Sequence, residues 1–256
     1  MKAISSKKVS YFRPSHISLL VAAAFPMMVH AQSNLGTVSI TGDQLGSGLM
    51  AVEETPKARS SVSKAAIEQN SASSNAYQNL SLLPGVYTYN HDGSGLFNGG
   101  LTMRGFNSDQ LGFTVDGAPV NDSGNFAMYP MELMDSENMC EMFVTQGSTD
   151  TDAPHVGASG GNIGMVTCSP KDKFGMRTAV SKGQLNYQRA FVRVDTGKFG
   201  PSDAKAFVSY SKTSADKFKG PGEANREHID FAAEVRPNAD VFLSASVLYN
   251  KAINNN

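Results

Sequence analysis

The residues of this chain that could carry chemistry are two cysteines and a group of methionines. Cys140 and Cys168 are its only cysteines. They are too few for a four-cysteine zinc site and could be free thiols, metal ligands or a disulfide. Five methionines fall close together, at positions 128, 131, 134, 139 and 142. Thioethers can bind copper, but flexible apolar side chains more often fill a core, so we predict a core role and no metal site.

No motif in the sequence is typical of an enzyme. Ser, His and Asp are present without the G-x-S-x-G pattern of many nucleophilic serines. Asp150 and Asp152 lack the spacing of a calcium-binding loop. The chain has 22 basic and 23 acidic residues and a net charge of −1, whereas nucleic-acid binders usually carry a basic excess. We therefore expect no catalysis, no cofactor and no nucleic-acid partner.

Residues 1–31 have the composition of a secretory signal peptide. A basic leader contains Lys2, Lys7, Lys8 and Arg13, and an apolar stretch follows over residues 17–29. The run V-H-A that ends at Ala31 is a small-residue cleavage pattern. As a membrane anchor the apolar stretch would be short, because a spanning helix needs about 20 residues. We predict cleavage after Ala31 and export from the cytoplasm.

The next segment, residues 32–59, is polar and contains several glycines, which predicts a linker. Inside it lies a short β-prone run between two glycines, made of Gly36, Thr37, Val38, Ser39, Ile40, Thr41 and Gly42. An isolated strand of this length is not stable by itself. It is either an edge that waits for a partner strand or an ordinary first strand.

Residues 60–171 have the pattern of a compact α+β unit. Ser74 can cap a short helix in which Ala76, Leu80 and Leu83 share one face, and a Pro-Gly pair ends it at Gly85. Short β-prone runs between turn residues predict strands at residues 86–89, 101–105, 113–116, 139–145 and 162–167.

From residue 172 onward the pattern changes to strands of strict alternation. Apolar and polar side chains alternate over residues 189–196, 205–211, 228–236 and 240–250. This pattern fits a transmembrane β-barrel with a wet lumen, although a soluble β-sandwich would show a similar alternation. Connections alternate between short and longer, as they do in outer-membrane barrels. We count about five strands, too few to close a barrel, and therefore expect the chain to be the N-terminal part of a longer protein.

Several motifs occur in the order found in TonB-dependent outer-membrane receptors, and the chain resembles the start of this family. The run at 36–42 resembles the TonB box, and Y-Q-N-L-S-L-L-P-G-V at 77–86 resembles the plug-domain helix and its end. L-T-M-R-G-F at 101–106, V-D-G-A-P-V-N-D at 115–122 and the glycine-rich run at 157–164 resemble successive plug strands. The plug-motif residues are Arg104, Gly105, Asp116, Gly117, Gly160 and Gly161.

The resemblance implies an α+β plug domain over residues 60–171, followed at 172–256 by the first strands of a barrel of about 22 strands in the outer membrane. It also implies active uptake of a scarce nutrient, above all a ferric siderophore, bound on the outer side of the plug. The TonB box would pair by strand addition with TonB, which works with ExbB–ExbD. The alternative is a secreted or outer-membrane binding protein, α+β or β-sandwich, without energy coupling.

Two glycine- and asparagine-rich segments are expected to face the ligand, because loops between strands commonly carry function. They cover residues 87–97 and 121–128. The candidate ligand-facing residues are His91, Asp92, Asn121, Asp122 and Asn125.

One motif departs from the family. The family has a charged strand of the form E-R-I-E-V-L-R-G, whose charges help to lock the plug to the barrel. The aligned run here is M-C-E-M-F-V-T-Q-G at 139–147, so that Phe143 replaces an acid and Gln146 replaces an arginine. Of the charged plug residues, Arg104 and Glu141 remain as candidates for a lock.

Export predicts an oxidising environment, in which Cys140 and Cys168 would form a disulfide. If the strands at 139–145 and 162–167 are antiparallel with Val144 opposite Gly164, then Cys140 lies opposite Cys168. Directly opposed residues have Cβ atoms about 4.5–5.5 Å apart, close to what a bridge needs. Such a bridge would add about 3 kcal/mol of stability. The alternative is two buried free thiols.

Overall fold

The computed structural model describes residues 50–51, 58–71, 74–147 and 157–254 of the chain. All of these described residues belong to one compact unit. The predicted signal peptide, the β-prone run at 36–42 and the acids Asp150 and Asp152 lie outside the described residues.

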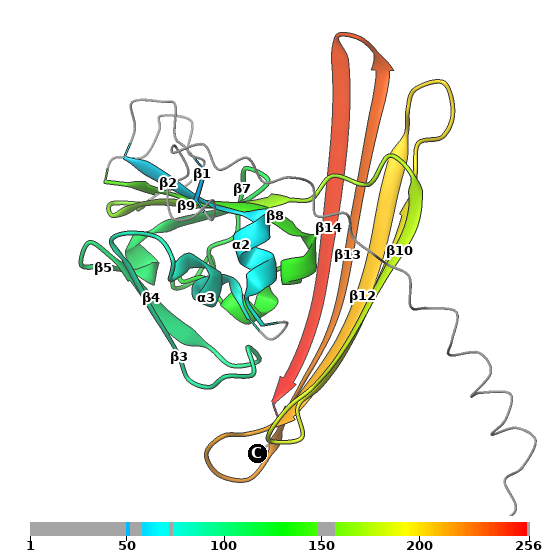
Figure 1. The fold of residues 1–256 in the computed structure, drawn as a ribbon. Coiled ribbons are helices and arrows are strands. Elements are labelled where there is room, and N and C mark those ends of the chain that lie inside the picture. Colours follow the sequence, from blue (N-terminus) through cyan, green and yellow to red (C-terminus); the bar gives the residue numbers. More distant parts are fainter. Residues whose placement is uncertain (1–49, 52–57, 72–73, 148–156, 255–256) are drawn as a thin grey trace, which may run out of the picture. The chain divides into compact units, whose positions relative to one another are not determined.

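A six-stranded sheet forms the larger layer of the N-terminal α+β region (Figure 1). Its strand order is β1-β2-β8-β9-β6-β7, and all neighbours are antiparallel except the parallel pair β6 and β9. The strands are β1 (Met50–Ala51), β2 (Arg59–Ser63), β6 (Gly112–Val115), β7 (Ala118–Pro119), β8 (Met139–Gln146) and β9 (Gly161–Thr167).

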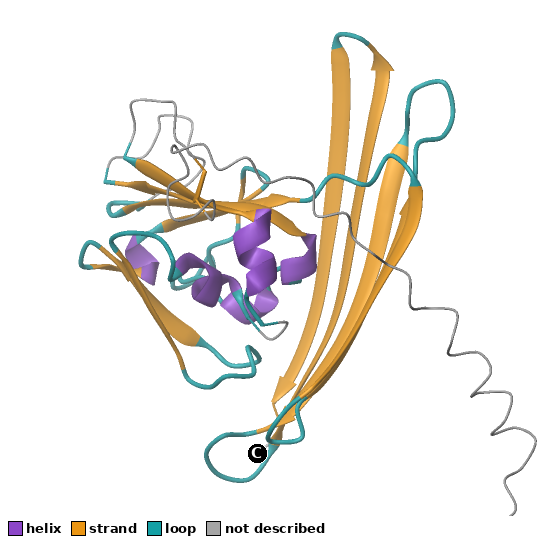
Figure 2. Cartoon of the chain, in the orientation of Figure 1, coloured by secondary structure: helices purple, strands orange, loops and turns teal. Residues whose placement is uncertain are grey.

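A smaller antiparallel sheet joins β3 (Val86–Asn90), β4 (Gly99–Met103) and β5 (Phe106–Asn107). The helices lie between the two sheets (Figure 2). They are α2 (Lys64–Gln69), α3 (Ala76–Leu80) and the 3₁₀ turns η3 (Ser108–Gln110), η4 (Pro130–Glu132) and η5 (Ser136–Asn138).

The expected helix is present but its cap differs. Asn75, not Ser74, is the N-cap of α3, and it forms a reciprocal capping box with Gln78. An asparagine oxygen accepts from the N3 amide as well as serine would, and the glutamine side chain returns the bond. The preceding strand β2 and helix α2 were not predicted. Their serine- and alanine-rich sequence carries a weak pattern, and β2 is held by pairing with distant β8.

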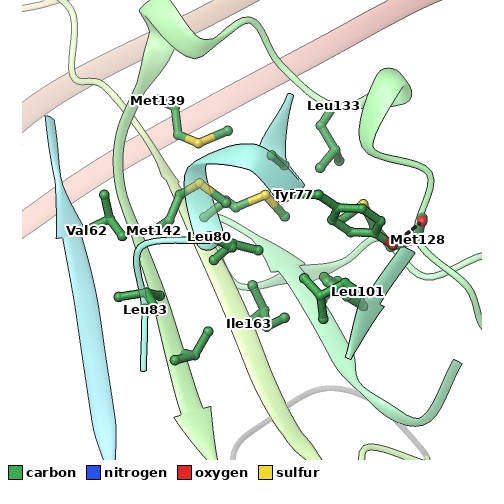
Figure 3. Packing of buried hydrophobic residues seen from close by; sticks show 14 of the residues in the cluster. Val62, Tyr77, Leu80, Leu83, Leu101, Met128, Leu133, Met139, Met142 and Ile163 are labelled. Carbon is green, nitrogen blue, oxygen red and sulfur yellow. Dashed lines mark hydrogen bonds between the residues drawn. The ribbon is translucent and has the colours of Figure 1, made fainter. Parts of the chain in front are cut away.

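An apolar core fills the space between the two sheets. Tyr77, Leu80 and Phe113 are fully buried there, and the Tyr77 hydroxyl donates to the Met128 carbonyl at 2.8 Å (Figure 3). Burial raises the pKa of Tyr77 to about 12. Four of the five clustered methionines belong to this core: Met128, Met134, Met139 and Met142. Their thioethers fill apolar space, as predicted.

Five long antiparallel strands follow the α+β region in chain order. They are β10 (Phe174–Lys182), β11 (Gln188–Thr196), β12 (Lys205–Asp216), β13 (Glu223–Asn238) and β14 (Val241–Asn254). Charged side chains such as Arg189 and Arg193 are buried, whereas Phe174 and Val180 are 76% and 78% exposed. A sandwich would bury the apolar face, so the barrel pattern is the one observed. No helix among the described residues is long and apolar enough to cross a membrane.

Cys140 and Cys168 are joined by a disulfide with a Cα–Cα distance of 4.8 Å. The register behind it is not the expected one, because Val144 lies opposite Ile163 and Gly164 lies opposite Phe143. The Phe143 ring occupies the space that a Cβ on residue 164 would need, which selects this register. A bulge between Met139 and Glu141 then inserts one residue and brings Cys140 beside Cys168.

Candidate functional site

The first expected ligand loop lies beside the turns of the long strands. Asp92 and Ser94 share a 570 Å³ cavity with Lys182 at the end of β10, with Tyr187 of the β10–β11 connection and with Phe218 of the β12–β13 connection. Asp92 shapes its own loop, since its carboxylate accepts from the Ser94 backbone at 3.2 Å and from the Ser94 hydroxyl at 2.7 Å. The cavity is therefore built jointly by this loop and the strand ends.

His91 lines a second, smaller cavity of 170 Å³ next to the first. Its other lining residues are Asp92, Phe97, Lys217, Phe218 and Lys219. The His91 ring lies 6.0 Å from the Tyr89 ring, and the His91 amide donates to the Asn98 carbonyl at 3.1 Å. The two cavities together are lined by aromatic rings, by three lysines and by the carboxylates of Asp92 and Asp216.

The second expected ligand loop is organised differently. Asn121 accepts from the Phe113 amide at 2.8 Å and donates to the Leu111 and Phe126 carbonyls at 2.9 and 2.7 Å. Asp122 accepts from the amides of Gly124 and Asn125, and the Asn125 side chain donates to the Tyr129 hydroxyl at 2.6 Å. These three side chains hold their own loop together and line neither of the two cavities.

The plug-motif residues mostly shape the backbone. Arg104 and Gly105 have φ of 51° and 87° in the turn from β4 to β5, and Asp116 and Gly117 have φ of 49° and 83° in the β6–β7 hairpin. Two consecutive positive φ values suit a type I′ turn, for which Asp-Gly is a preferred pair. A Cβ at position 160 would clash with Phe106, and a Cβ at position 161 would clash with the Thr145 carbonyl oxygen.

Asp116 has a second role that its turn position does not reveal. Its carboxylate accepts from the Thr167 amide at 2.8 Å and from the Thr167 hydroxyl at 2.7 Å. It also accepts from the Ser246 hydroxyl of β14 at 3.1 Å. The motif aspartate thus links the small hairpin, the end of β9 and one of the long strands.

A dense polar contact joins the turn at residues 135–138 to the inner face of the long strands. Arg189 of β11 donates to both Glu137 oxygens at 2.6 and 2.8 Å and lies 3.1 Å from Asp135. Arg226 of β13 lies 2.7 Å from Asp135. Burial opposes the charge on Asp135, but Arg226 and Arg189 hold its pKa below the usual range. We call residues 135–138 and their strand partners the latch.

Asn138 completes the latch. Its amide donates to the Ser209 hydroxyl at 2.7 Å and to Asp230 at 2.6 Å, and its oxygen accepts from Arg193 at 3.1 Å. Lys64 of α2 supports the turn from behind, because its ammonium donates to the carbonyls of residues 136, 137 and 139. Burial is the main cause that lowers the pKa of Lys64 to about 8.

Of the two residues that remained as candidates for the family lock, Glu141 is used inside the α+β region. Glu141 pairs with Arg59 at 3.4 Å, and the Arg59 guanidinium lies 3.7 Å from the centre of the Phe143 ring. The Gln146 amide donates to the Pro84 carbonyl at 2.5 Å. The latch itself was missed at the sequence level. Its only local signals were the polar run D-S-E-N before β8 and the arginines on the polar face of β11.

A polar turn of the α+β unit contacts the charged face of the strands that follow it. This arrangement is that of a plug domain joined to the first strands of a barrel. Residues 51–161 match the family described as TonB-dependent Receptor Plug Domain. Residues 51–161 thus match a TonB-dependent receptor plug domain, and the fold of the chain matches the N-terminal part of solved TonB-dependent receptors. The recognition and the fold class predicted from the sequence are thereby confirmed.

Solved structures share this fold at low sequence identity. The pyoverdine receptor FpvA of Pseudomonas aeruginosa PAO1 matches with a TM-score of 0.63 and 19% identity over 77% of this chain. The siderophore receptor PiuA of Acinetobacter baumannii matches at 0.61 and 22% over 77%. The copper transporter OprC matches at 0.59 and 16% over 80%. The chain spans 28%, 27% and 32% of these three proteins. No curated protein matches the chain.

Proposed function

We propose that the chain is the N-terminal part of a TonB-dependent outer-membrane transporter that takes up a ferric siderophore. The observation that carries the proposal is the plug-domain match over residues 51–161, joined to strands that keep their polar face toward the plug. Plug domains of this family belong to transporters, and no catalytic role is proposed for any residue.

The cavity beside residues 91–97 supports an anionic aromatic chelate as the ligand. Its volume of 570 Å³ is that of a small-molecule site. Lys182, Lys217 and Lys219 bring three positive charges to the two cavities against the carboxylates of Asp92 and Asp216. Phe97 and Phe218 bring aromatic surface. Basic side chains attract an anion, and ring faces stack on catechol-like groups. Within this chain, His91 and Asp92 are the proposed contact residues.

Copper is the other cargo that a structural neighbour suggests. Four of the five clustered methionines are packed in the plug core, where Met128, Met139 and Met142 are at most 2% exposed. Of the five, only Met131 is partly exposed. A soft-metal site needs accessible thioethers. The described part of the chain therefore favours the siderophore.

Energy coupling is assigned to residues 36–42. We propose that this run leaves the plug as an extended strand and pairs with TonB, driven by ExbB–ExbD, after export by the signal peptide at 1–31. Main-chain hydrogen bonds would supply the binding affinity and would require few specific side chains.

The test is siderophore-dependent iron uptake by the full-length protein in cells that lack their own receptors. Ile40→Pro removes a backbone donor and fixes φ, so uptake should stop while siderophore binding survives. Ser39→Ala keeps the backbone intact and is the matched control with normal uptake. Normal uptake by the proline variant would contradict the coupling role. Binding without any uptake by the unaltered protein would instead indicate a binding protein without energy coupling.

A further inference from the structure

Both cysteines of the disulfide lie close to the latch. Cys140 lies in the bulge of β8, two residues after Asn138, and the Cys168 amide donates to the Asn138 carbonyl at 2.7 Å. Ser169 follows Cys168, and its carbonyl accepts from Arg193 at 3.3 Å. Arg193 also donates to the Asn138 side chain. Each cysteine therefore lies within two residues of a residue that contacts Arg193.

The disulfide can be reached from a cavity. A space of 270 Å³ is lined by both cysteines and by Ser169. Four basic residues line the same space, Lys64, Lys171, Arg177 and Arg193, against the two acids Glu68 and Glu137. An attacking thiolate is an anion, and so is the cysteine thiolate that leaves. A basic lining stabilises both and so favours exchange at this bond.

We propose that Cys140–Cys168 is a redox-controlled clamp that sets how firmly the latch holds the plug on the strands. A dithiol reductant attacks one sulfur as a thiolate and forms a mixed disulfide. Its second thiol then displaces the protein sulfur. The protein gains two electrons and two protons as two cysteine thiols, and the reductant becomes its own disulfide.

The physical consequence of reduction follows from the bulge. With the bridge open, nothing covalent holds the extra residue of β8 in place, and Asn138 loses the anchor that fixes its position in the latch. Buried ion pairs stabilise only when their geometry is kept, because both charges have lost their water. A small shift of the turn therefore weakens the contacts of Glu137 and Asp135 together. The proposal does not depend on the ligand or the energy source of the proposed function.

The main experiment compares hydrogen exchange of the full-length protein in detergent micelles, oxidised and after treatment with dithiothreitol. We expect exchange of residues 135–140 and 168–171 to accelerate by about tenfold or more, with the amides of Phe113 and Ile163 unchanged. A passive staple would instead lower protection evenly across the plug. An even loss of protection, or no change, would overturn the proposal.

A second measurement tests the basic lining and does not depend on a cysteine variant that folds. Lys171→Glu should slow reduction by anionic glutathione by about two- to fivefold and leave reduction by a neutral phosphine unchanged. Lys251→Glu on β14 reverses the same charge at a residue that is not part of this lining and should leave both rates unchanged. Equal rates with glutathione in the unaltered protein and in Lys171→Glu would contradict the role of the lining. Slowing by the same factor with the phosphine would contradict it too, because charge would not be the cause.

Discussion

The plug and the long strands bury opposite kinds of side chain. In the plug, the buried cluster is apolar, with Leu80, Phe113 and Met142 at its centre. On the strands, buried positions include Arg189, Arg193 and Asp230, while Val180 is 78% exposed. A soluble unit keeps apolar groups from water, whereas a strand sheet that faces lipid keeps its polar groups away from hydrocarbon. The plug therefore has the burial pattern of a soluble unit, and the long strands have the pattern expected of strands that face lipid.

The latch is the contact at which the plug meets the polar face of the long strands. The inner face of β11 to β13 carries charged side chains, which only water would solvate if the plug were absent. The plug contacts this face through a polar turn and not through its apolar core. Asp135 and Glu137 bring two negative charges to Arg189 and Arg226. The plug therefore completes the polar side of the strands, and the strands satisfy a turn that would otherwise bury two carboxylates unpaired.

The largest expected change in the free energy of unfolding comes from a substitution in the latch. Arg189→Met leaves Glu137 buried without its arginine partner and removes one of the two arginines that pair with Asp135. It should lower the free energy of unfolding by about 3–5 kcal/mol. Arg177→Met removes a similar pair with half-exposed Glu68 at 2.9 Å, which should cost less than about 1 kcal/mol. Urea unfolding of the full-length protein in micelles measures both. Equal losses would show that burial does not separate the two pairs.

A pair of glycines tests the two regions directly. Gly164→Ala places a methyl group against the Phe143 ring in the plug sheet and should cost about 1–3 kcal/mol by overpacking. Gly175→Ala on β10 meets nothing closer than 3.9 Å and should be neutral or stabilise by about 0.4–1 kcal/mol. Melting temperatures of both variants decide the matter. A destabilising Gly175→Ala would mean that the strand face is as tightly packed as the plug.

A further expected effect concerns pH. Burial lowers the pKa of Lys64 from 10.5 to about 8, so between these values the unfolded chain binds more protons than the folded one. The free energy of unfolding should therefore rise with pH across this window. Lys64→Met should remove that rise, as seen by urea unfolding at pH 7.5, 9 and 10.5. Lys251→Met, at an exposed position of β14, should keep it. A rise of the same size in Lys64→Met would assign the effect to another group.

Much of the framework could be predicted because its signals are local. The Asp116-Gly117 pair predicts its own turn, since few residues adopt two consecutive positive φ values. The alternation in β11 to β14 predicts opposite faces because a strand turns its side chains over at each residue. The order of short motifs along the chain predicts the plug-domain family that residues 51–161 match.

What local signals could not predict depends on partners far along the chain. The start of β2 pairs Arg59 with Thr145, and the latch joins Glu137 to Arg189 across 52 positions. The register of β8 and β9 was one residue from the expected one, because a ring at Phe143 needs the glycine at 164. The disulfide still forms because a bulge absorbs that single residue.

The sequence by itself thus determined which segments become plug and which become strands, because composition and alternation select a solvent for each stretch of chain. Only the tertiary structure decided which charges of the plug meet which charges of the strands. A carboxylate on a polar turn has no local preference among distant arginines. Its partner is set by which side chains the packed core and the strand register bring within hydrogen-bond distance, and burial then makes that choice costly to undo.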